Sequence, residues 1–224
     1  MHPRTEEVLS YLNQTESELR AAVDLVPAGA RGTKPSAEQW SAAQVLDHLA
    51  IANNLVAALV AKSIGEAQAN GLGPETATAS VLNTIPADRI RDRSQKVPAP
   101  ERILPRNEID IETAWGAFAQ AREKLRAAFL TGDGLALEQV IKPHPVLGPI
   151  NMYQWVLFNG SHEARHTLQV REIAAHFNSA LTCRLNCDCP DIARAERRIS
   201  TTTEMARIVI RVCLAADFKS ALDR

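Results

Sequence analysis

Residues 151–176 read NMYQWVLFNGSHEARHTLQVREIAAH, and this stretch predicts a long helix with His162 and His166 on its inward face. Helix geometry of about 100° and about 1.5 Å per residue places side chains at i and i+4 roughly 40° and roughly 6 Å apart. Two imidazoles at that spacing can converge on one cation. Trp155 and Ile173 project between the two histidines on the helical wheel. The face that carries the histidines is therefore also the face that enters the core.

A third ligand is needed, because Zn²⁺-type ions usually take three protein ligands and keep one position open for water or substrate. His48 lies in residues 41–61, SAAQVLDHLAIANNLVAALVA, which also predict a helix. The apolar stripe that includes His48 also contains Val45, Ala52, Leu55 and Leu59. The sequence thus favours His48, His162 and His166 as ligands of one divalent metal ion.

The other three histidines fit such a site less well. His2 lies at a chain end, where fraying is common. His176 is fourteen residues beyond His162, or roughly 21 Å along the helix axis. His144, in the stretch KPHPVLGPI, lies between two prolines outside any predicted helix, and we interpret it as a turn histidine.

A structural role without metal is the alternative for the inward histidines. A single inward histidine is usually a hydrogen-bonded core residue, and this interpretation holds for His48 taken alone. A buried i, i+4 pair without metal leaves two polar rings in need of partners. The helix 151–176 offers few partners besides Asn159 and Gln169. The pair therefore favours a metal site.

Composition narrows the class of protein. The chain has 224 residues, 46% of them hydrophobic and 23% charged, with a formal net charge of −1, which suits one folded core. Charges of both signs are interspersed, so no basic stripe is available for nucleic acid. The first twenty residues lack the apolar region of a signal peptide, and no apolar run is long enough to span a membrane. We therefore expect a soluble, cytoplasmic protein that acts on a small-molecule substrate.

Long helical patterns cover most of the chain, and strand patterns are nearly absent. The patterns span about residues 4–26, 41–70, 111–131 and 151–176. Ser41 with Gln44, and Asn151 with Gln154, predict capping boxes at the starts of the second and fourth patterns. Four amphipathic helices bury their apolar stripes most simply as a four-helix bundle, with ligands drawn from facing helices. The predicted fold class is all-α.

Two segments fall outside these helical patterns. The long connection between residues 70 and 111 carries four prolines in residues 85–110 alone, too many for a continuous helix, and is long enough to cover the metal site. Residues 179–224 form an atypical tail, so we divide the chain into a bundle domain, 1–178, and a tail, 179–224. Within the tail, only residues 203–217 predict a helix, and a weak one.

All four cysteines fall late in the chain, at Cys183, Cys187, Cys189 and Cys213. The predicted bundle therefore contains no thiol nucleophile and no disulfide. The cysteine spacing lacks the paired C-x2-C knuckles of a structural zinc site, so we interpret these residues as reduced, unrelated thiols.

Three motifs follow one another along the chain. They are Trp40-Ser41-x-x-Gln44-Val45-x-x-His48-Leu49, His144-Pro145-x-x-Gly148-Pro149 and His162-x-x-x-His166-x-x-Gln169. In their order and separation, over about residues 5–176, they resemble the DinB-like family, also grouped with the YfiT-like metal-dependent hydrolases. The resemblance implies a four-helix bundle, often a homodimer, that holds Ni²⁺, Zn²⁺ or a similar ion on residues matching His48, His162 and His166. The tail departs from the family, whose members typically end soon after the fourth helix.

The resemblance also implies an activity. Several family members resemble transferases that join a low-molecular-weight thiol, such as bacillithiol, mycothiol or glutathione, to an electrophile. Three neutral imidazoles leave a cation its full charge, so a bound thiol or water loses its proton near neutral pH. In this hypothesis Gln169 or Asn159 orients the ligands, and Glu163 is a candidate base. Glu163 lies about 80° from the ligand mid-angle, which also suits a charge between helices.

Two other functions remain open. Residues 162–166 satisfy the H-E-x-x-H pattern of zinc peptidases, in which the glutamate activates a metal-bound water. The longer form of that pattern fails, because Gln169 stands where its glycine belongs and Glu172 where its last histidine belongs. A metal-dependent hydrolase and a non-catalytic metal-binding protein are thus the alternatives to the transferase.

Overall fold

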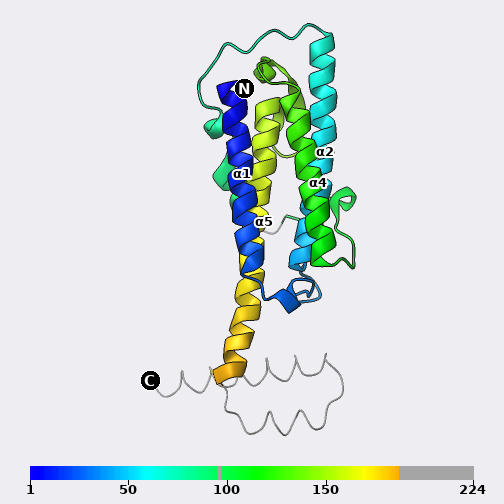
Figure 1. Ribbon diagram of the computed structural model, residues 1–224, viewed down its shortest axis with the longest axis vertical. Helices are drawn as coiled ribbons and strands as arrows, with labels where there is room; N and C mark the ends of the chain where they lie inside the picture. The colour runs from blue at the N-terminus through cyan, green and yellow to red at the C-terminus, as the bar shows by residue number, and fades with distance from the viewer. Residues whose placement is uncertain (95–96, 187–224) are drawn as a thin grey trace. The chain divides into compact units, whose positions relative to one another are not determined.

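Four long helices form a bundle in the computed structural model, which describes residues 1–94 and 97–186, with side chains through Ser179. The helices are α1 (Pro3–Asp24), α2 (Ala42–Ala69), α4 (Ile111–Leu130) and α5 (Met152–Asn186) (Figure 1). This architecture confirms the predicted all-α fold. The chain divides into two compact units, Met1–Phe177 and Asn178–Arg224, and the bundle described below belongs to the first.

Helices α2 and α4 run parallel to each other, and α5 runs in the opposite direction (Figure 1). Near the start of both parallel helices, the Gln44 amide donates to the carbonyl of Asn107. Near their ends, the Gln68 amide donates to the carbonyl of Thr131. Because α2 and α4 are parallel, the chain must return along the bundle between them, about 42 Å for a helix of 28 residues. This return explains the long connection predicted from the prolines.

The described residues of the connection, 71–94 and 97–110, contain three short helical segments. They are η2 (Leu82–Thr84), α3 (Ala87–Arg91) and η3 (Glu101–Ile103). The return path therefore runs as short turns between prolines, in keeping with the loss of backbone donors that proline causes.

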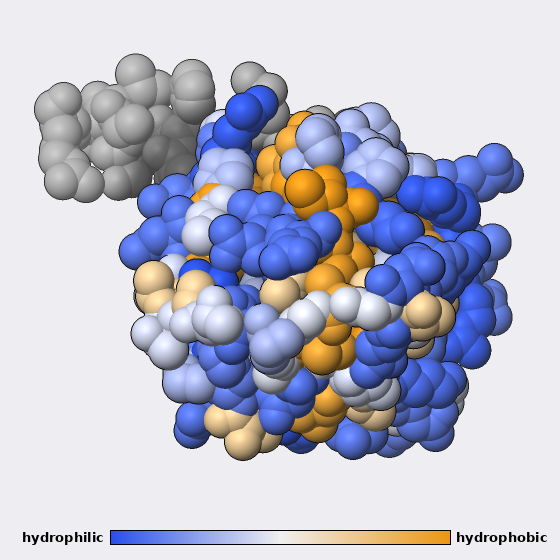
Figure 2. Space-filling model, turned by 90° about the horizontal axis from the view of Figure 1, so that it is seen from above, coloured by the Kyte–Doolittle hydropathy of each residue, from blue (hydrophilic) through white to orange (hydrophobic). Residues whose placement is uncertain are grey.

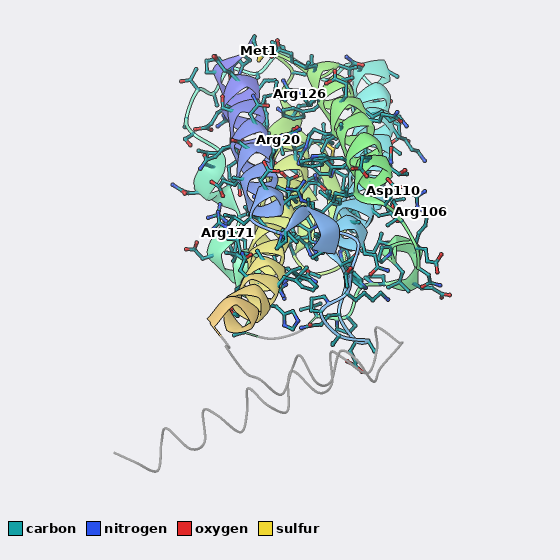
Figure 3. All side chains as sticks on the ribbon, turned by 60° about the horizontal axis from the view of Figure 1, so that its bottom comes forward. Met1, Arg20, Arg106, Asp110, Arg126 and Arg171 are labelled. Atoms are coloured by element: carbon teal, nitrogen blue, oxygen red, sulfur yellow. The ribbon has the colours of Figure 1, made fainter. Side chains whose placement is uncertain are left out.

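Helices α1 and α5 pack closely against each other. A Cβ atom at Gly160 of α5 would lie 2.6 Å from Cε1 of Tyr11, so only glycine fits beneath this ring. The Tyr11 hydroxyl is 2.9 Å from the hydroxyl of Ser161. On the α4 side of α1, the Arg20 guanidinium lies over the Trp115 ring, 4.5 Å from its centroid (Figure 3 labels Arg20). These contacts fix α1 against both α4 and α5.

Both predicted capping boxes are present. The backbone N–H of Gln44 donates to the Ser41 hydroxyl, and the backbone N–H of Ser41 donates to the side-chain oxygen of Gln44. Asn151 and Gln154 exchange the same pair of bonds, each 3.0 Å long, at the start of α5. Each helix that carries a candidate ligand therefore has a defined first turn.

As expected, strands are nearly absent from the described residues, and the exception lies in residues 141–151. They form a hairpin of β1 (Ile141–His144) and β2 (Gly148–Asn151), with Pro143 paired opposite Pro149. In a sheet of two strands each strand is an edge, so prolines are tolerated. The predicted turn histidine, His144, is the last residue of β1.

The last helix is longer than predicted. It was expected to end near residue 176, but α5 continues to Asn186. Residues 177–186 contain neither glycine nor proline, so no residue that breaks helices ends it earlier. The helix expected near residues 203–217, together with Cys187, Cys189 and Cys213, lies outside the described residues.

The buried apolar side chains form two clusters with a polar layer between them. One cluster includes Leu12 of α1 and Leu125 of α4. The other includes Leu19 of α1 and Phe118 of α4. Between them in sequence, on all four helices, lie buried polar residues: Thr15, Asn53, Arg122, Asn159, Ser161, Glu163 and Thr167. The polar layer crosses the bundle at the level from which the two histidines of α5 project.

Helix α2 is a core helix. Its length and composition would suit a membrane span, but 67% of its most apolar window is buried inside the bundle. Leu55 was expected on the inward stripe and is instead 45% exposed, because the buried stripe continues through Val56 and Val60.

Figure 2, which views the bundle from the end at which α1 begins, shows an apolar band bordered by hydrophilic residues.

A buried ion pair ties the start of α1 to the connection that follows α2. The Arg4 guanidinium contacts the Glu75 carboxylate at 3.1 Å, and the Tyr153 hydroxyl donates to the same oxygen at 3.2 Å. Burial alone would raise the pKa of Glu75, but the Ala77 amide, Arg4 and Tyr153 together lower it below its ordinary value of 4.5. Its charged form is therefore stabilised in the folded protein.

We expect the Glu75 charge to contribute to the acid limb of stability. A carboxylate with a depressed folded-state pKa stabilises the fold above its unfolded value, and this contribution is lost as the pH falls through the folded-state pKa. Glu75→Gln should lower the free energy of unfolding at pH 7 by about 1.5–3 kcal/mol. It should also flatten the decline below pH 4.5. Urea unfolding at several pH values measures both, and an unchanged acid slope in the variant would contradict the assignment.

Candidate metal centre

His48, His162 and His166 come together between α2 and α5, with one ligand atom of each within 4.8 Å of the others. Nε2 of His162 is 3.4 Å from Nε2 of His48 and 3.1 Å from Nε2 of His166. His48 and His166 are buried, and His162 is partly exposed. The structure thus gathers the three histidines that spacing and resemblance selected.

The Nδ1 atoms of two of these rings are bound to oxygen. Nδ1 of His48 lies 2.7 Å from the carbonyl oxygen of Ile103, which can only accept. Nδ1 of His166 lies 2.8 Å from Oε1 of Gln169. The Arg93 guanidinium, which can only donate, contacts the same Gln169 atom at 3.5 Å and supports its assignment as oxygen. Both imidazoles therefore carry their proton on Nδ1 and direct an Nε2 lone pair toward His162.

These lone pairs make the cluster fit a cation. Neutral His48 and His166 each present an acceptor at Nε2, and Nε2 of His162 faces both of these atoms. A proton on Nε2 of His162 could form a hydrogen bond to only one of the two acceptors. Two nitrogens bound tetrahedrally to one Zn²⁺ lie about 3.3–3.4 Å apart, given Zn–N distances of about 2.0–2.1 Å. The two Nε2–Nε2 separations in the structure are 3.1 and 3.4 Å. Nitrogen donors bound through their outer N–H to a carbonyl or an amide are typical of metal ligands.

Electrostatics keeps the imidazoles neutral. Burial, followed by the charges of neighbouring groups that include His48, lowers the pKa of His162 to about 3. Burial also lowers the pKa of His48, and lowers that of His166 well below its ordinary value. The neutral form, which is the form that binds metal, is therefore the stable one at neutral pH.

Aromatic rings line the cluster. Trp40 lies 4.9 Å from His48 and 6.2 Å from His166, measured between ring centroids. Phe158 is stacked 6.0 Å from His162. Trp40 precedes the helix and so escapes a helical-wheel argument, although the Trp40-Ser41 motif contained the signal.

The long connection supplies part of the site. One contribution is the Ile103 carbonyl, which binds His48. Another is Arg106, which donates to the Asp47 carboxylate from its backbone nitrogen at 2.8 Å and from its guanidinium at 2.7 Å. Burial would raise the pKa of Asp47, but the bonds from Arg106 lower it. Arg106 and Asp110 lie together where the connection enters α4 (Figure 3). The connection is thus anchored one residue away from His48.

The three predicted catalytic residues have different surroundings. Gln169 contacts His166 and suits the orienting role. Asn159 instead donates from its amide to Asn53 of α2 at 3.0 Å, within the polar layer. Glu163 forms an ion pair with Arg122 of α4, and both side chains are almost fully buried. Glu163 therefore lies in the interface between α4 and α5, to one side of the histidines.

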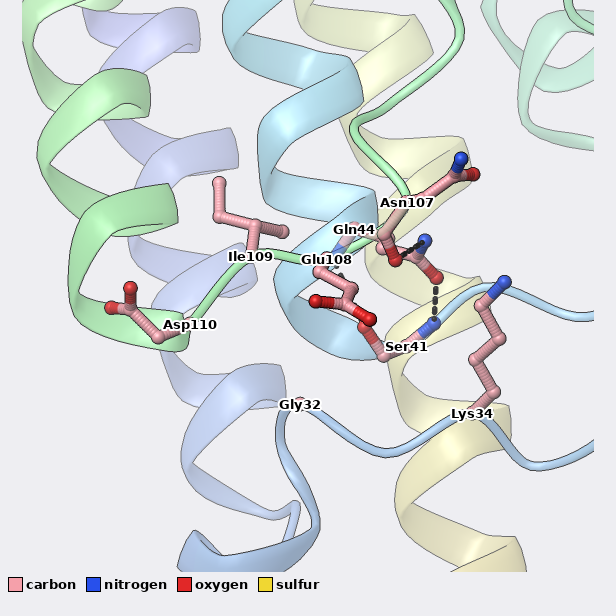
Figure 4. Close-up of a pocket in the computed structure, with 8 residues that line it drawn as sticks. All are labelled: Gly32, Lys34, Ser41, Gln44, Asn107, Glu108, Ile109 and Asp110. Atoms are coloured by element: carbon pink, nitrogen blue, oxygen red, sulfur yellow. Dashed lines mark hydrogen bonds between the residues drawn. The ribbon is translucent and has the colours of Figure 1, made fainter.

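A separate cavity of about 450 Å³ lies at the start of α2 (Figure 4). Its lining includes Ser41, Gln44 and Asn107. Two of its polar side chains are already engaged, because Ser41 and Gln44 form the capping box and the Gln44 side-chain amide donates to the carbonyl of Asn107. The cavity is lined by none of the three histidines, and we assign no ligand to it.

Comparison with known proteins agrees with this geometry. The sequence profile of the DinB superfamily matches residues 11–170. The uncharacterized protein YuaE of Bacillus subtilis is 30% identical over 141 residues, which cover 62% of this chain and 80% of YuaE. No solved structure matches the chain.

The Arg122–Glu163 pair should behave as a buried structural pair. Burial lowers the pKa of Arg122 to about 10, so it remains charged at neutral pH beside Glu163. Arg122→Met or Glu163→Leu alone leaves one buried charge without its partner and should cost about 3–5 kcal/mol. The double variant Arg122→Met/Glu163→Leu removes both charges and should regain most of that loss, with metal content unchanged. Urea unfolding measures the cycle, and additive losses would contradict the pairing.

Proposed function

This chain belongs to the DinB superfamily, and we propose that it is a divalent-metal-dependent transferase that joins a low-molecular-weight thiol to a small electrophile. The observation that carries the metal-dependent part is the convergence of three imidazoles. One ring nitrogen of each lies within 4.8 Å of the others, and the Nε2 lone pairs of His48 and His166 are fixed by the bonds at Nδ1. Zn²⁺ or Ni²⁺ suits three imidazole ligands.

In this proposal the chain's own residues bind the ion and orient the rings that ligate it. His48, His162 and His166 bind the ion, while the Ile103 carbonyl and Gln169 fix two of the rings. When bound, the ion supplies a positive charge that lowers the pKa of a thiol or water ligand.

The nucleophile comes from a bound molecule in this proposal. Residues 1–179 contain no cysteine, so a protein thiol is absent from the part of the bundle whose side chains are described. Partial exposure of His162 leaves one side of the cluster open to a small ligand. A cytoplasmic location belongs to the same proposal, because low-molecular-weight thiols are kept reduced there.

The surroundings of Glu163 weigh against the peptidase alternative. A water-activating glutamate needs a carboxylate that faces the metal's open position. Glu163 is fully buried against Arg122, in the interface with α4. In this proposal the H-E-x-x-H motif contributes only its two histidines, as metal ligands.

Removal of one ligand should abolish both metal binding and activity. We expect His166→Ala to lose its divalent metal, because two imidazoles do not hold such an ion durably. His176→Ala is the matched control, since His176 lies on the same helix and is exposed. Elemental analysis of the purified proteins measures the metal. Mass spectrometry of conjugates between glutathione, bacillithiol or mycothiol and 1-chloro-2,4-dinitrobenzene measures the activity, with and without chelator.

The outcomes separate the candidate functions. Metal and chelator-sensitive conjugation in wild type and His176→Ala, with both lost in His166→Ala, support the transferase. Metal without conjugation of any of the three thiols favours the non-catalytic binding protein. Metal content unchanged in His166→Ala would mean that the site is misplaced.

A further inference from the structure

His144 is a buried histidine that lies beside the cluster but does not belong to it. Its ring lies between those of Trp155 and Phe158, with centroid separations of 4.7 and 4.0 Å, and the residue is 6% exposed. It lies at the end of β1, and it is not one of the three residues gathered at the candidate metal centre.

The hairpin fixes the tautomer of this ring. Nδ1 of His144 accepts from the backbone N–H groups of Val146 and Leu147, each at 3.1 Å. A backbone N–H can only donate, so Nδ1 carries no proton. Burial lowers the pKa of His144, and the ring is therefore neutral at pH 7. Its single proton lies on Nε2, which makes Nε2–H a hydrogen-bond donor.

This donor lies on the edge of the ring that is turned away from the hairpin tip. Among the residues that the structure describes, Nε2 of His144 has no hydrogen-bond acceptor. Phe158 packs on His144 and is also stacked 6.0 Å from His162. The centroids of the His144 and His162 rings are therefore no more than 10.0 Å apart.

We propose that His144 is a substrate-binding residue that donates a hydrogen bond from Nε2 to an acceptor oxygen of the molecule bound at the three-histidine cluster. The inference rests on the proposed metal site and adds a contact that selects the ligand.

The donor itself indicates the kind of acceptor. The positive charge of Arg93 beside the cluster is balanced by the Glu172 carboxylate, which lies 2.8 Å away. A hydrogen bond from an N–H group to a charged acceptor is stronger than one to a neutral acceptor, so a carboxylate gains the most from this donor. The substrate class is therefore a thiol that also bears a carboxylate.

Two variants separate the structural role of this ring from the binding role. His144→Asn keeps an acceptor near the position of Nδ1 for the Val146 and Leu147 amides, but removes the Nε2–H donor. His144→Gln places an amide N–H₂ near the position of Nε2, but removes the nearby acceptor. If the ring only stabilises the hairpin, His144→Asn resembles wild type in every measurement.

The test uses the full-length protein loaded with Co²⁺ and two thiols of equal length. Titration with 3-mercaptopropionate or 1-propanethiol, followed by the thiolate-to-cobalt absorption, gives a dissociation constant for each. Only the first thiol carries a carboxylate. We expect His144→Asn to bind 3-mercaptopropionate roughly tenfold or more weakly than wild type, the usual effect of losing one charge-assisted bond. Its cobalt content, melting temperature and affinity for 1-propanethiol should be unchanged, and His144→Gln should retain part of the preference for the carboxylate.

Several results would overturn the proposal. Equal affinities of wild type and His144→Asn for 3-mercaptopropionate would leave the ring a hairpin residue only, while the metal site stands. Equal weakening for both thiols, or loss of cobalt, would assign the effect to the fold or the metal. Failure of wild type to take up cobalt would overturn the proposed function and this inference together.

A measurement without metal tests the premise independently. Long-range ¹H–¹⁵N correlation spectra of the metal-free protein distinguish the two neutral tautomers of His144. The Nε2–H tautomer supports the proposal, and the Nδ1–H tautomer would overturn it whatever the cobalt titrations give.

Discussion

The requirement that buried polar groups find partners determines how this bundle is assembled. A polar layer lies between two apolar clusters, and leaving any of its groups unpaired costs free energy. Asn53 with Asn159 joins α2 to α5, and Arg122 with Glu163 joins α4 to α5. Two such pairs on different sides of one helix fix its rotation. With α5 held this way, His162 and His166 must face α2 and the connection, where His48 lies.

The topology brings a loop to the site for a mechanical reason. Parallel α2 and α4 require the chain to cross the length of the bundle between them, and residues near the end of that crossing pass beside the start of α2. There the Ile103 carbonyl orients His48, and Arg106 anchors the segment on Asp47. A backbone carbonyl can orient His48 whatever side chain its residue carries, so the loop sequence gives no sign of this role.

Helical periodicity predicted the helices and the three histidines because both depend on spacing within one segment. The long segments and both capping boxes follow from local patterns of apolar and capping residues. The partner of Glu163 did not follow, because pairing with Arg122 depends on how two helices are rotated against each other. The sequence did contain a hint, since Arg122 interrupts the apolar stripe between Phe118 and Leu125. The position of Trp40 beside His48 and the hairpin of residues 141–151 were not predicted, because neither depends on a periodic pattern.

The H-E-x-x-H letters illustrate how packing assigns chemistry to a motif. The i, i+4 histidines share a face in any helix, so their convergence follows from spacing alone. The glutamate follows the first histidine by one residue and points about 100° away from it, toward whatever packs on that side. In a helix bordering an open cleft, that direction holds substrate and water. In this bundle it holds α4, and the carboxylate meets the buried guanidinium of Arg122. In this chain the H-E-x-x-H motif therefore provides two candidate metal ligands and one partner of an interhelix ion pair. Whether its glutamate pairs with a cation or can activate water depends on the helix that packs beside it.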